Sequence, residues 1–207
     1  MLIGLMVFAL AFILYVVIKA FRDIGFTVFE TLVLLLGSIV AFRFIPDIPI
    51  YWYENTILSI NVAGFLIPVI ISAKMIKSGR APFMECLVGV AVVAVIAYQL
   101  SEFIAGKGVL ISNIYLPSFV AAIIGVVLSK KVWNRVGPIS YVSGSMGILV
   151  GADVVRLNEI LAYQSPTLTV LSIGGAGIFD AIFIAGIIAV TLGILTMPLA
   201  RMTEGQR

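Results

Sequence analysis

The sequence S-I-G-G-A-G-I-F-D, at Ser172–Asp180, lies near the start of an apolar run that covers residues 168–200. This run contains a single charged residue, Asp180. The preceding apolar run ends in G-I-L-V-G-A-D, which places a second isolated acid at Asp153. A carboxylate inside a segment of hydrocarbon length is costly, and it usually marks a functional site. The two acids are therefore the first candidates for functional residues.

The composition of the 207-residue chain is that of an integral membrane protein, with 62% hydrophobic and 11% charged residues. A soluble domain is nearer half apolar and a quarter charged. The chain has one cysteine and no histidine, which excludes disulfides within the chain, Cys/His metal sites and catalysis by an imidazole base. The sequence also lacks phosphate-binding loops, dinucleotide motifs and a basic stripe for nucleic acid. It thus predicts no metal, no cofactor and no nucleic-acid partner, and its main partner is the lipid bilayer.

Seven apolar runs are long enough to cross a bilayer, for which a helix needs about 20 residues. They cover residues 2–19, 26–45, 57–76, 82–103, 109–129, 138–157 and 168–200. An aromatic cluster, Tyr51-Trp52-Tyr53, follows the second run and fits the headgroup layer of a membrane. The sequence predicts an all-α bundle of about seven transmembrane helices, in a single transmembrane domain over residues 1–207.

The basic residues between the runs predict the orientation, because Lys and Arg concentrate on the cytoplasmic side of a membrane. Ten of them follow the first, third, fifth and seventh runs: Lys19, Arg22, Lys74, Lys77, Arg80, Lys130, Lys131, Arg135, Arg201 and Arg207. Three follow the second, fourth and sixth runs: Arg43, Lys107 and Arg156. This asymmetry predicts a multi-pass protein of the cell membrane with its N-terminus outside and its C-terminus inside.

Small residues recur at four-residue spacing on the last two runs. The sixth run has Ser143, Gly147 and Gly151, and the seventh has Gly177, Ala181, Ala185, Ala189 and Gly193. Such rows let two membrane helices approach closely, and they are common as plain packing surfaces. We expect these two runs to pack against each other.

The run over residues 168–200 is too long for one straight span, whereas residues 178–199 can cross the membrane alone at 1.5 Å per residue. Residues 172–177 are then non-helical or re-entrant. Irregular backbone at membrane depth is tolerated only against protein or a water-filled cavity. We therefore expect a pocket with four glycines on its wall, within reach of both acids at the same outer depth. These glycines are Gly151, Gly174, Gly175 and Gly177.

Two carboxylates in one pocket cannot both ionise cheaply, and such a pair holds one proton between them. An aspartyl protease uses this arrangement, and it needs no metal, cysteine or histidine. The sequence therefore predicts intramembrane hydrolysis of membrane-embedded peptides, with Asp153 and Asp180 as the catalytic pair.

Other interpretations of the two acids stay open. Asp180 can cap a helix N-terminus, and Asp153 can pair with Arg156 one turn further on. The same acids can serve a proton- or cation-coupled transporter or channel. A membrane scaffold without enzymatic activity is a third interpretation.

Three stretches resemble an uncharacterised prokaryotic membrane-protein family, a domain of unknown function. They are I-N-V-A-G-F-L-I-P-V at Ile60–Val69, Y-V-S-G-S-M-G-I-L-V-G-A-D at Tyr141–Asp153 and S-I-G-G-A-G-I-F-D-A-I-F-I-A-G at Ser172–Gly186. This resemblance indicates a family for the chain but implies no activity.

A more distant likeness is to the GxGD intramembrane aspartyl proteases, such as presenilin and signal peptide peptidase. These families have one Asp on one helix and a second in Gly-x-Gly-Asp at the start of the next. The resemblance implies that Asp153 matches the first acid, and that Gly175–Asp180 matches the second motif. Two residues separate Gly177 from Asp180 where those families have none, and Ala152 stands where presenilins have Tyr.

Two polar residues outside these motifs have simpler explanations. Asn61, in the third run, is expected to form an interhelical hydrogen bond. Glu30 lies near the start of the second run, where capping a helix suffices to explain it.

Overall fold

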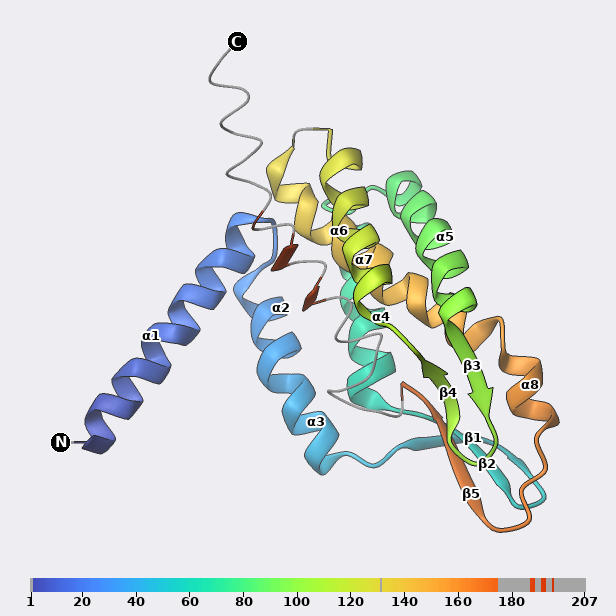
Figure 1. The fold of residues 1–207 in the computed structure, drawn as a ribbon. Helices are drawn as coiled ribbons and strands as arrows, with labels where there is room; N and C mark the ends of the chain where they lie inside the picture. Colours follow the sequence, from blue (N-terminus) through green and yellow to red (C-terminus); the bar gives the residue numbers. More distant parts are fainter. Residues whose placement is uncertain (1, 131, 175–186, 189–190, 193–194, 196–207) are drawn as a thin grey trace.

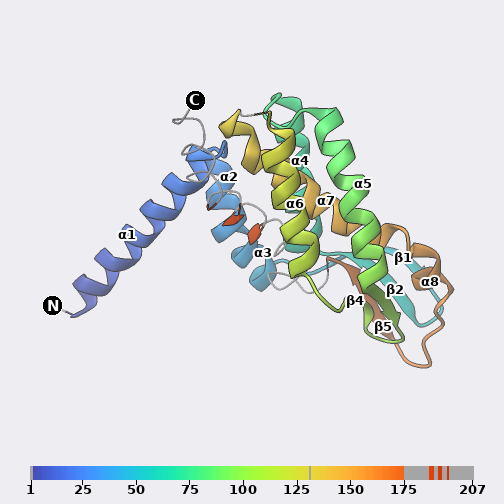
Figure 2. The ribbon, with the colours of Figure 1, turned by 45° about the horizontal axis from the view of Figure 1, so that its top comes forward.

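The computed structural model describes residues 2–130, 132–174, 187–188, 191–192 and 195. Helices form most of this part of the chain, and short strands gather at one end of the helical bundle (Figure 1). The α1–α2, α4–α5 and α6–α7 connections lie at the opposite end (Figures 1 and 2). We call these two ends the strand end and the loop end.

The N-terminal third of the chain supplies one projecting helix and two helical segments of the bundle. Its elements are α1 (Leu2–Asp23), α2 (Val28–Leu32), the π-helical turn η1 (Val33–Gly37), α3 (Ser38–Phe44), the π-helical turn η2 (Val62–Leu66) and α4 (Ile67–Lys77). Helix α1 projects away from the bundle (Figure 1). Its side chains Leu5, Phe8 and Leu10 are more than 60% exposed. So large an apolar surface on an isolated helix requires lipid or protein around it.

The centre of the bundle is α7, on which nearly every residue is buried. The remaining helical elements are α5 (Phe83–Leu100), α6 (Tyr115–Leu128), η3 (Trp133–Arg135), α7 (Val136–Ile148), η4 (Leu149–Val154) and α8 (Leu157–Ala162). A Cβ added at Gly147 would meet Val93 of α5, and one at Gly151 would meet the Ala94 backbone. The small-residue row of α7 and η4 therefore packs against α5, where we had expected the seventh run. All the small residues of the corresponding row on the seventh run lie outside the described residues. Near this row the structure describes residues 187–188 and 191–192.

Two small sheets cover the strand end. They are built from β1 (Ile48–Tyr53), β2 (Thr56–Ile60), β3 (Ser101–Ile104), β4 (Gly108–Ile111) and β5 (Thr169–Ile173). The first sheet has the order β1-β2-β5, with β1 antiparallel and β5 parallel to β2. Its register pairs Ile57 with Val170. The second sheet is the β3–β4 hairpin, which pairs Phe103 with Val109.

The prediction of a purely helical protein is correct for the bundle and wrong at the strand end. The runs over residues 57–76 and 109–129 each begin with a strand, β2 or β4, and the run over 82–103 ends in β3. The seventh run begins with β5. Strands β2, β4 and β5 are largely apolar and lie next to helical or turn residues, so hydropathy alone joins each strand and its neighbouring residues into one segment.

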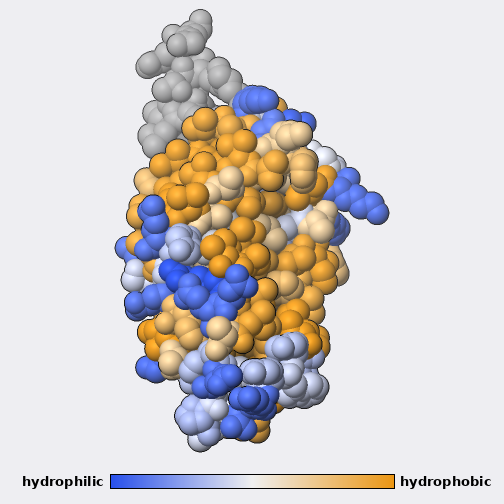
Figure 3. Space-filling view, turned by 90° about the vertical axis from the view of Figure 1, so that its right-hand side faces the viewer, coloured by the Kyte–Doolittle hydropathy of each residue, from blue (hydrophilic) through white to orange (hydrophobic). Residues whose placement is uncertain are grey.

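Three helices of the described chain are long and apolar enough to cross a membrane: Gly4–Asp23, Phe83–Leu100 and Trp133–Ala162. Helix α6 is apolar but shorter. On the face shown in Figure 3, hydrophobic residues cover a broad area, and hydrophilic residues lie at its upper right edge, in a patch near the middle and at the bottom. The protein thus has the apolar helices and surface of a membrane protein.

Candidate functional site

A cavity of about 360 Å³ lies at the strand end, where the sheets meet the helices. Its wall combines apolar side chains with three charged residues. The lining residues are Asp47, Leu58, Lys107, Gly108, Val109, Leu110, Asp153, Ile160, Val170, Leu171, Ser172, Ile173 and Gly174. Ligand sites commonly have this size and this mixture of apolar wall and few polar groups.

The polar side of the cavity is organised around Asp47, which precedes β1. Its carboxylate accepts a hydrogen bond from the side-chain amide of Asn61 at 2.6 Å and another from the hydroxyl of Ser172. The oxygen of the same Asn61 side chain accepts from the backbone N–H of Gly64 at 2.9 Å, which caps η2. The prediction that Asn61 forms an interhelical hydrogen bond is wrong, because its side-chain partner is the loop residue Asp47 and Asn61 itself lies between β2 and η2.

Backbone packing fixes the end of β5 beside this network. Gly174 has a φ of +70°, a left-handed conformation that favours glycine. A Cβ added at Gly174 would meet the backbone of Gly64 at 2.7 Å, and one added at Gly64 would meet Gly174. The two backbones are therefore in direct contact, and the start of η2 holds in place the residue that follows β5.

The structure describes three of the six residues that the sequence analysis placed in the pocket. Asp153, in the π-helical turn η4, lines the cavity, and so does Gly174. Such turns within helices occur frequently at functional sites. Gly151 is buried against α5. The predicted residues Gly175, Gly177 and Asp180 lie outside the described residues.

Comparison with known protein families places the chain. A family model described as a protein of unknown function, DUF1614, matches residues 17–192. The chain belongs to this family. No curated protein and no solved structure matches it. The matched range contains the whole cavity wall and the position of Asp180, so the cavity lies within the part of the chain that defines a DUF1614 protein.

Sequence reasoning missed two charged residues of this DUF1614 cavity, Asp47 and Lys107. Asp47 stands in the motif P-D-I-P, which reads as a loop between two spans. Lys107 lies between Gly106 and Gly108, both with positive φ, in the β3–β4 turn. No local pattern links either residue to Asp153. Within the described residues, no cluster of His, Cys, Asp and Glu could hold a metal ion.

Arg156 stabilises the end of α5. Its guanidinium donates to the carbonyls of Tyr98, at 3.2 Å, and Ser101, and it forms an ion pair with Glu159 at 2.9 Å. Carbonyls at a helix C-terminus lack intrahelical partners, so this arginine stabilises the turn from α5 into β3.

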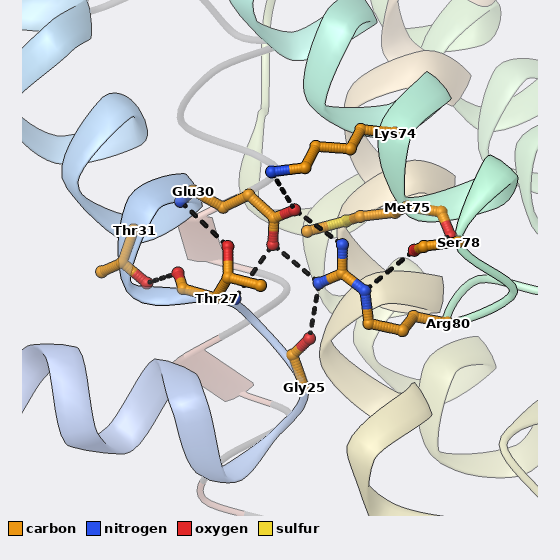
Figure 4. Close-up of polar contacts among 8 residues, drawn as sticks. All are labelled: Gly25, Thr27, Glu30, Thr31, Lys74, Met75, Ser78 and Arg80. Carbon is orange, nitrogen blue, oxygen red and sulfur yellow. Dashed lines mark hydrogen bonds and ion pairs between the residues drawn. The ribbon is translucent and has the colours of Figure 1, made fainter.

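A second polar cluster lies at the loop end and centres on Glu30 of α2 (Figure 4). Its fully buried carboxylate binds the Arg80 guanidinium through two bonds of 2.7 and 2.6 Å. Lys74 lies 3.3 Å away. Glu30 also forms a capping box with Thr27, so the predicted capping role is correct. The hydrogen bonds that Arg80 donates to Glu30 raise the pKa of Arg80 above its ordinary value.

This loop-end cluster joins segments that are far apart in the sequence. Arg80 also donates to the carbonyl of Gly25 at 3.0 Å, which connects the α4–α5 turn to the α1–α2 turn. A buried, bidentate Arg–carboxylate pair sets the relative position of the groups that it joins. The cluster therefore holds the loop end together, and we assign it a structural role.

Proposed function

We propose that the chain crosses the cell membrane seven times, with its N-terminus outside. The charge distribution over the two ends supports this orientation. Lys74, Lys77 and Arg80 flank the α4–α5 turn at the loop end, and Lys130 and Arg135 flank the α6–α7 turn at the same end. Positive residues mark the cytoplasmic side. In this orientation the strand end and its cavity face the outside of the cell.

We further propose that the protein hydrolyses peptides within the membrane, using Asp153 and Asp180 as an aspartyl pair. One carboxylate removes a proton from a water molecule, whose oxygen attacks the peptide carbonyl carbon. The other carboxylic acid then gives its proton to the amide nitrogen as the C–N bond breaks. The products are a carboxylic acid and an amine, and the two aspartates again share one proton.

One observation carries this proposal: Asp153 lines a cavity whose wall continues through Ser172 and Gly174. Asp180 follows Gly174 by six residues. The second acid therefore lies only a few residues along the sequence from the cavity wall. The cavity also has apolar walls, from Leu58, Val109 and others, that suit the side chains of a membrane peptide.

Proton- or cation-coupled transport by the same acids is the second candidate, and one observation favours it. Within the described chain, four buried hydroxyls have no hydrogen-bond partner: Ser72, Ser140, Tyr141 and Ser143. Three of them lie on α7, between the loop end and the acid-bearing turn η4. Polar groups along a membrane helix can line a path for ions or protons.

The experiment that tests the enzyme is cleavage of a labelled transmembrane peptide by purified protein in detergent. We expect cleavage by the wild type and loss of cleavage, by a factor of at least about 100, in Asp153→Asn and Asp180→Asn, since removal of a general acid or base costs 10²–10⁴-fold. Glu159→Gln is the matched control, because Glu159 lies at the same end but outside the cavity wall. Equal cleavage by all four proteins would refute the mechanism.

Transport has a different readout. Liposomes that contain the protein and a pH-sensitive dye report proton entry directly. Proton flux that is lost in both Asp→Asn variants, without peptide cleavage by the wild type, would favour the transporter.

A further inference from the structure

Every residue of strand β1 is exposed, although the strand consists of aliphatic, aromatic and proline residues alone (Figure 1). Tyr51, Trp52 and Tyr53 are 48%, 64% and 41% exposed. The neighbouring strand β2 is mostly buried. An exposed apolar patch of this kind marks a contact with protein or membrane.

This exposed surface of β1 continues the surface of helix α3, which ends at Phe44. Phe44 and Ile45 are exposed, and the single charged residue between them and Glu54 is Asp47. The Asp47 carboxylate turns inward, where it accepts the two side-chain hydrogen bonds described above. No charged group therefore separates the exposed surface of α3 from that of β1, so the same surroundings suit both.

Helix α5 shows where the bilayer ends relative to these strands. Its exposed apolar side chains run along its whole length, from Phe83 to Tyr98. Its 18 residues span about 27 Å, which is close to the hydrocarbon thickness of about 30 Å. The helix passes directly into β3 at Ser101. The strand end, which includes β1, therefore begins at the boundary of the bilayer.

The aromatic side chains of β1 lie on both faces of the sheet. Successive side chains of a strand point to opposite faces. Tyr51 and Tyr53 consequently lie on one face, where both border the same small pocket, and Trp52 lies on the other. A protein docked on the sheet would cover one face, whereas lipid surrounds a hairpin from both sides.

We propose that the β1–β2 hairpin lies in the headgroup layer of the bilayer, with lipid against both of its faces. Tyr and Trp favour this layer. The turn Glu54-Asn55 at the tip of the hairpin excludes a deeper position, because an ionised carboxylate in hydrocarbon is costly. The proposal rests on the function proposed above only in taking the helices to cross a membrane, and it does not require peptide hydrolysis. In the proposed orientation, the hairpin lies in the outer leaflet.

The hairpin also sets the depth of the cavity in the membrane. Tyr51 pairs with Leu58 of β2, and Leu58 lines the cavity. Strand β5, which forms another part of the wall, pairs with β2 as well. A hairpin held at the depth of the headgroups therefore holds the cavity beside them. The membrane would thus position the candidate site through a strand that contributes no residue to its wall.

Single cysteines that carry a nitroxide label test this placement, in a Cys86→Ala background and in vesicles of phosphatidylcholine and phosphatidylglycerol. Oxygen concentrates in hydrocarbon and a nickel chelate stays in water, so the ratio of their collision rates with the label reports its depth. Tyr51→Cys and Trp52→Cys test the two faces of the hairpin. Glu54→Cys is the control at the tip, and Val92→Cys, exposed in the middle of α5, is the control in hydrocarbon.

We expect the oxygen-to-nickel ratio at both faces to exceed that at Glu54→Cys by about threefold or more and to stay below that at Val92→Cys, because the headgroup layer lies between water and hydrocarbon. Size-exclusion profile and circular dichroism verify that each variant folds.

Tryptophan fluorescence provides a second measurement that needs no cysteine. The chain has two tryptophans, Trp52 and Trp133, so Trp133→Phe leaves Trp52 as the single reporter. Lipids with a nitroxide at different depths should place Trp52 at about 15 Å from the bilayer centre, which is half of the hydrocarbon thickness. Iodide in the water should quench it less than it quenches the unfolded protein.

Water-like ratios at Tyr51→Cys and Trp52→Cys, with a lipid-like ratio at Val92→Cys, would overturn the proposal and leave the membrane topology standing. A water-like ratio at Val92→Cys would refute both. Protection of either hairpin face from oxygen and from nickel would also overturn the proposal, since protein would then cover β1. If that protection is lost when the protein is diluted in lipid, the covering protein is a second copy of this chain. Peptide cleavage by the wild type is measured separately, and its result tests the hydrolase alone.

Discussion

Removal of the Arg80 guanidinium tests how the loop end is held together. In Arg80→Ala the buried Glu30 carboxylate loses two hydrogen bonds of 2.7 and 2.6 Å. The carbonyl of Gly25 loses its 3.0 Å bond in the same change. The substitution therefore leaves a fully buried charge without its main partner and frees the α1–α2 turn from the α4–α5 turn.

The expected loss of stability follows from this geometry. Breaking a buried ion pair by removing one partner costs about 3–5 kcal/mol. Lys74 stays 3.3 Å from Glu30 but is 48% exposed, so it compensates only in part. We expect a loss near the lower limit, about 3 kcal/mol, which is equivalent to a decrease of about 6–12 °C in Tm for a chain of this size.

The sole cysteine provides the assay. Cys86 is buried in the hydrophobic core and should react with a fluorogenic maleimide only when the protein unfolds. Thermal unfolding in detergent is followed by this reaction for the wild type, Arg80→Ala and Lys77→Ala. Lys77 is an exposed cation near the same turn, and its removal should change stability by less than about 0.5 kcal/mol. If Arg80→Ala unfolds at the same temperature as Lys77→Ala, the structural role proposed for the cluster is wrong.

In a double-mutant cycle, Glu30→Gln combined with Arg80→Ala should lower the stability by less than the sum of the two single changes.

Two further predictions follow from the cavity and the orientation. Gly64→Ala should destabilise the protein by about 1–3 kcal/mol, because the new methyl group meets the Gly174 backbone; a thermal melt as for the wild type would contradict that contact. In a Cys86→Ala background, a membrane-impermeant maleimide added to intact cells should label Lys107→Cys and not Lys77→Cys, and the reverse pattern would invert the proposed orientation.

The helical part of this fold could be predicted from hydropathy because each of the first six apolar runs contains a helix in the described chain. The strand end could not be predicted from hydropathy, because β2 and β4 are as apolar as the helices that follow them. Asn61 was the available local signal: it stands at the junction of β2 and η2 and caps the helical turn. A polar cap in the middle of an apolar run marks a change of secondary structure.

The candidate site was predictable only where one residue carried its own signal. Asp153 is an isolated acid in an apolar run, and its energetic cost identifies it without knowledge of the fold. Asp47 and Lys107 are ordinary loop residues in the sequence, and only the arrangement of the strands brings them to the same cavity. The position of these two residues at the cavity depends on pairing between segments that are more than 100 residues apart, such as β2 with β5.

The parallel pairing of β2 with β5 gives the cavity its position. Parallel strands cannot be joined by a tight turn, so the chain between them must cross over. Here the connection contains α4, α5, α6 and α7, and it brings β5 back to lie beside β2. Ser172 thereby meets Asp47, and the end of β5 contacts the start of η2. The seventh run consequently starts from a fixed point at the strand end. A shift of the β2–β5 register by one residue would turn Ser172 away from Asp47, so the sheet register and the polar wall of the cavity depend on each other.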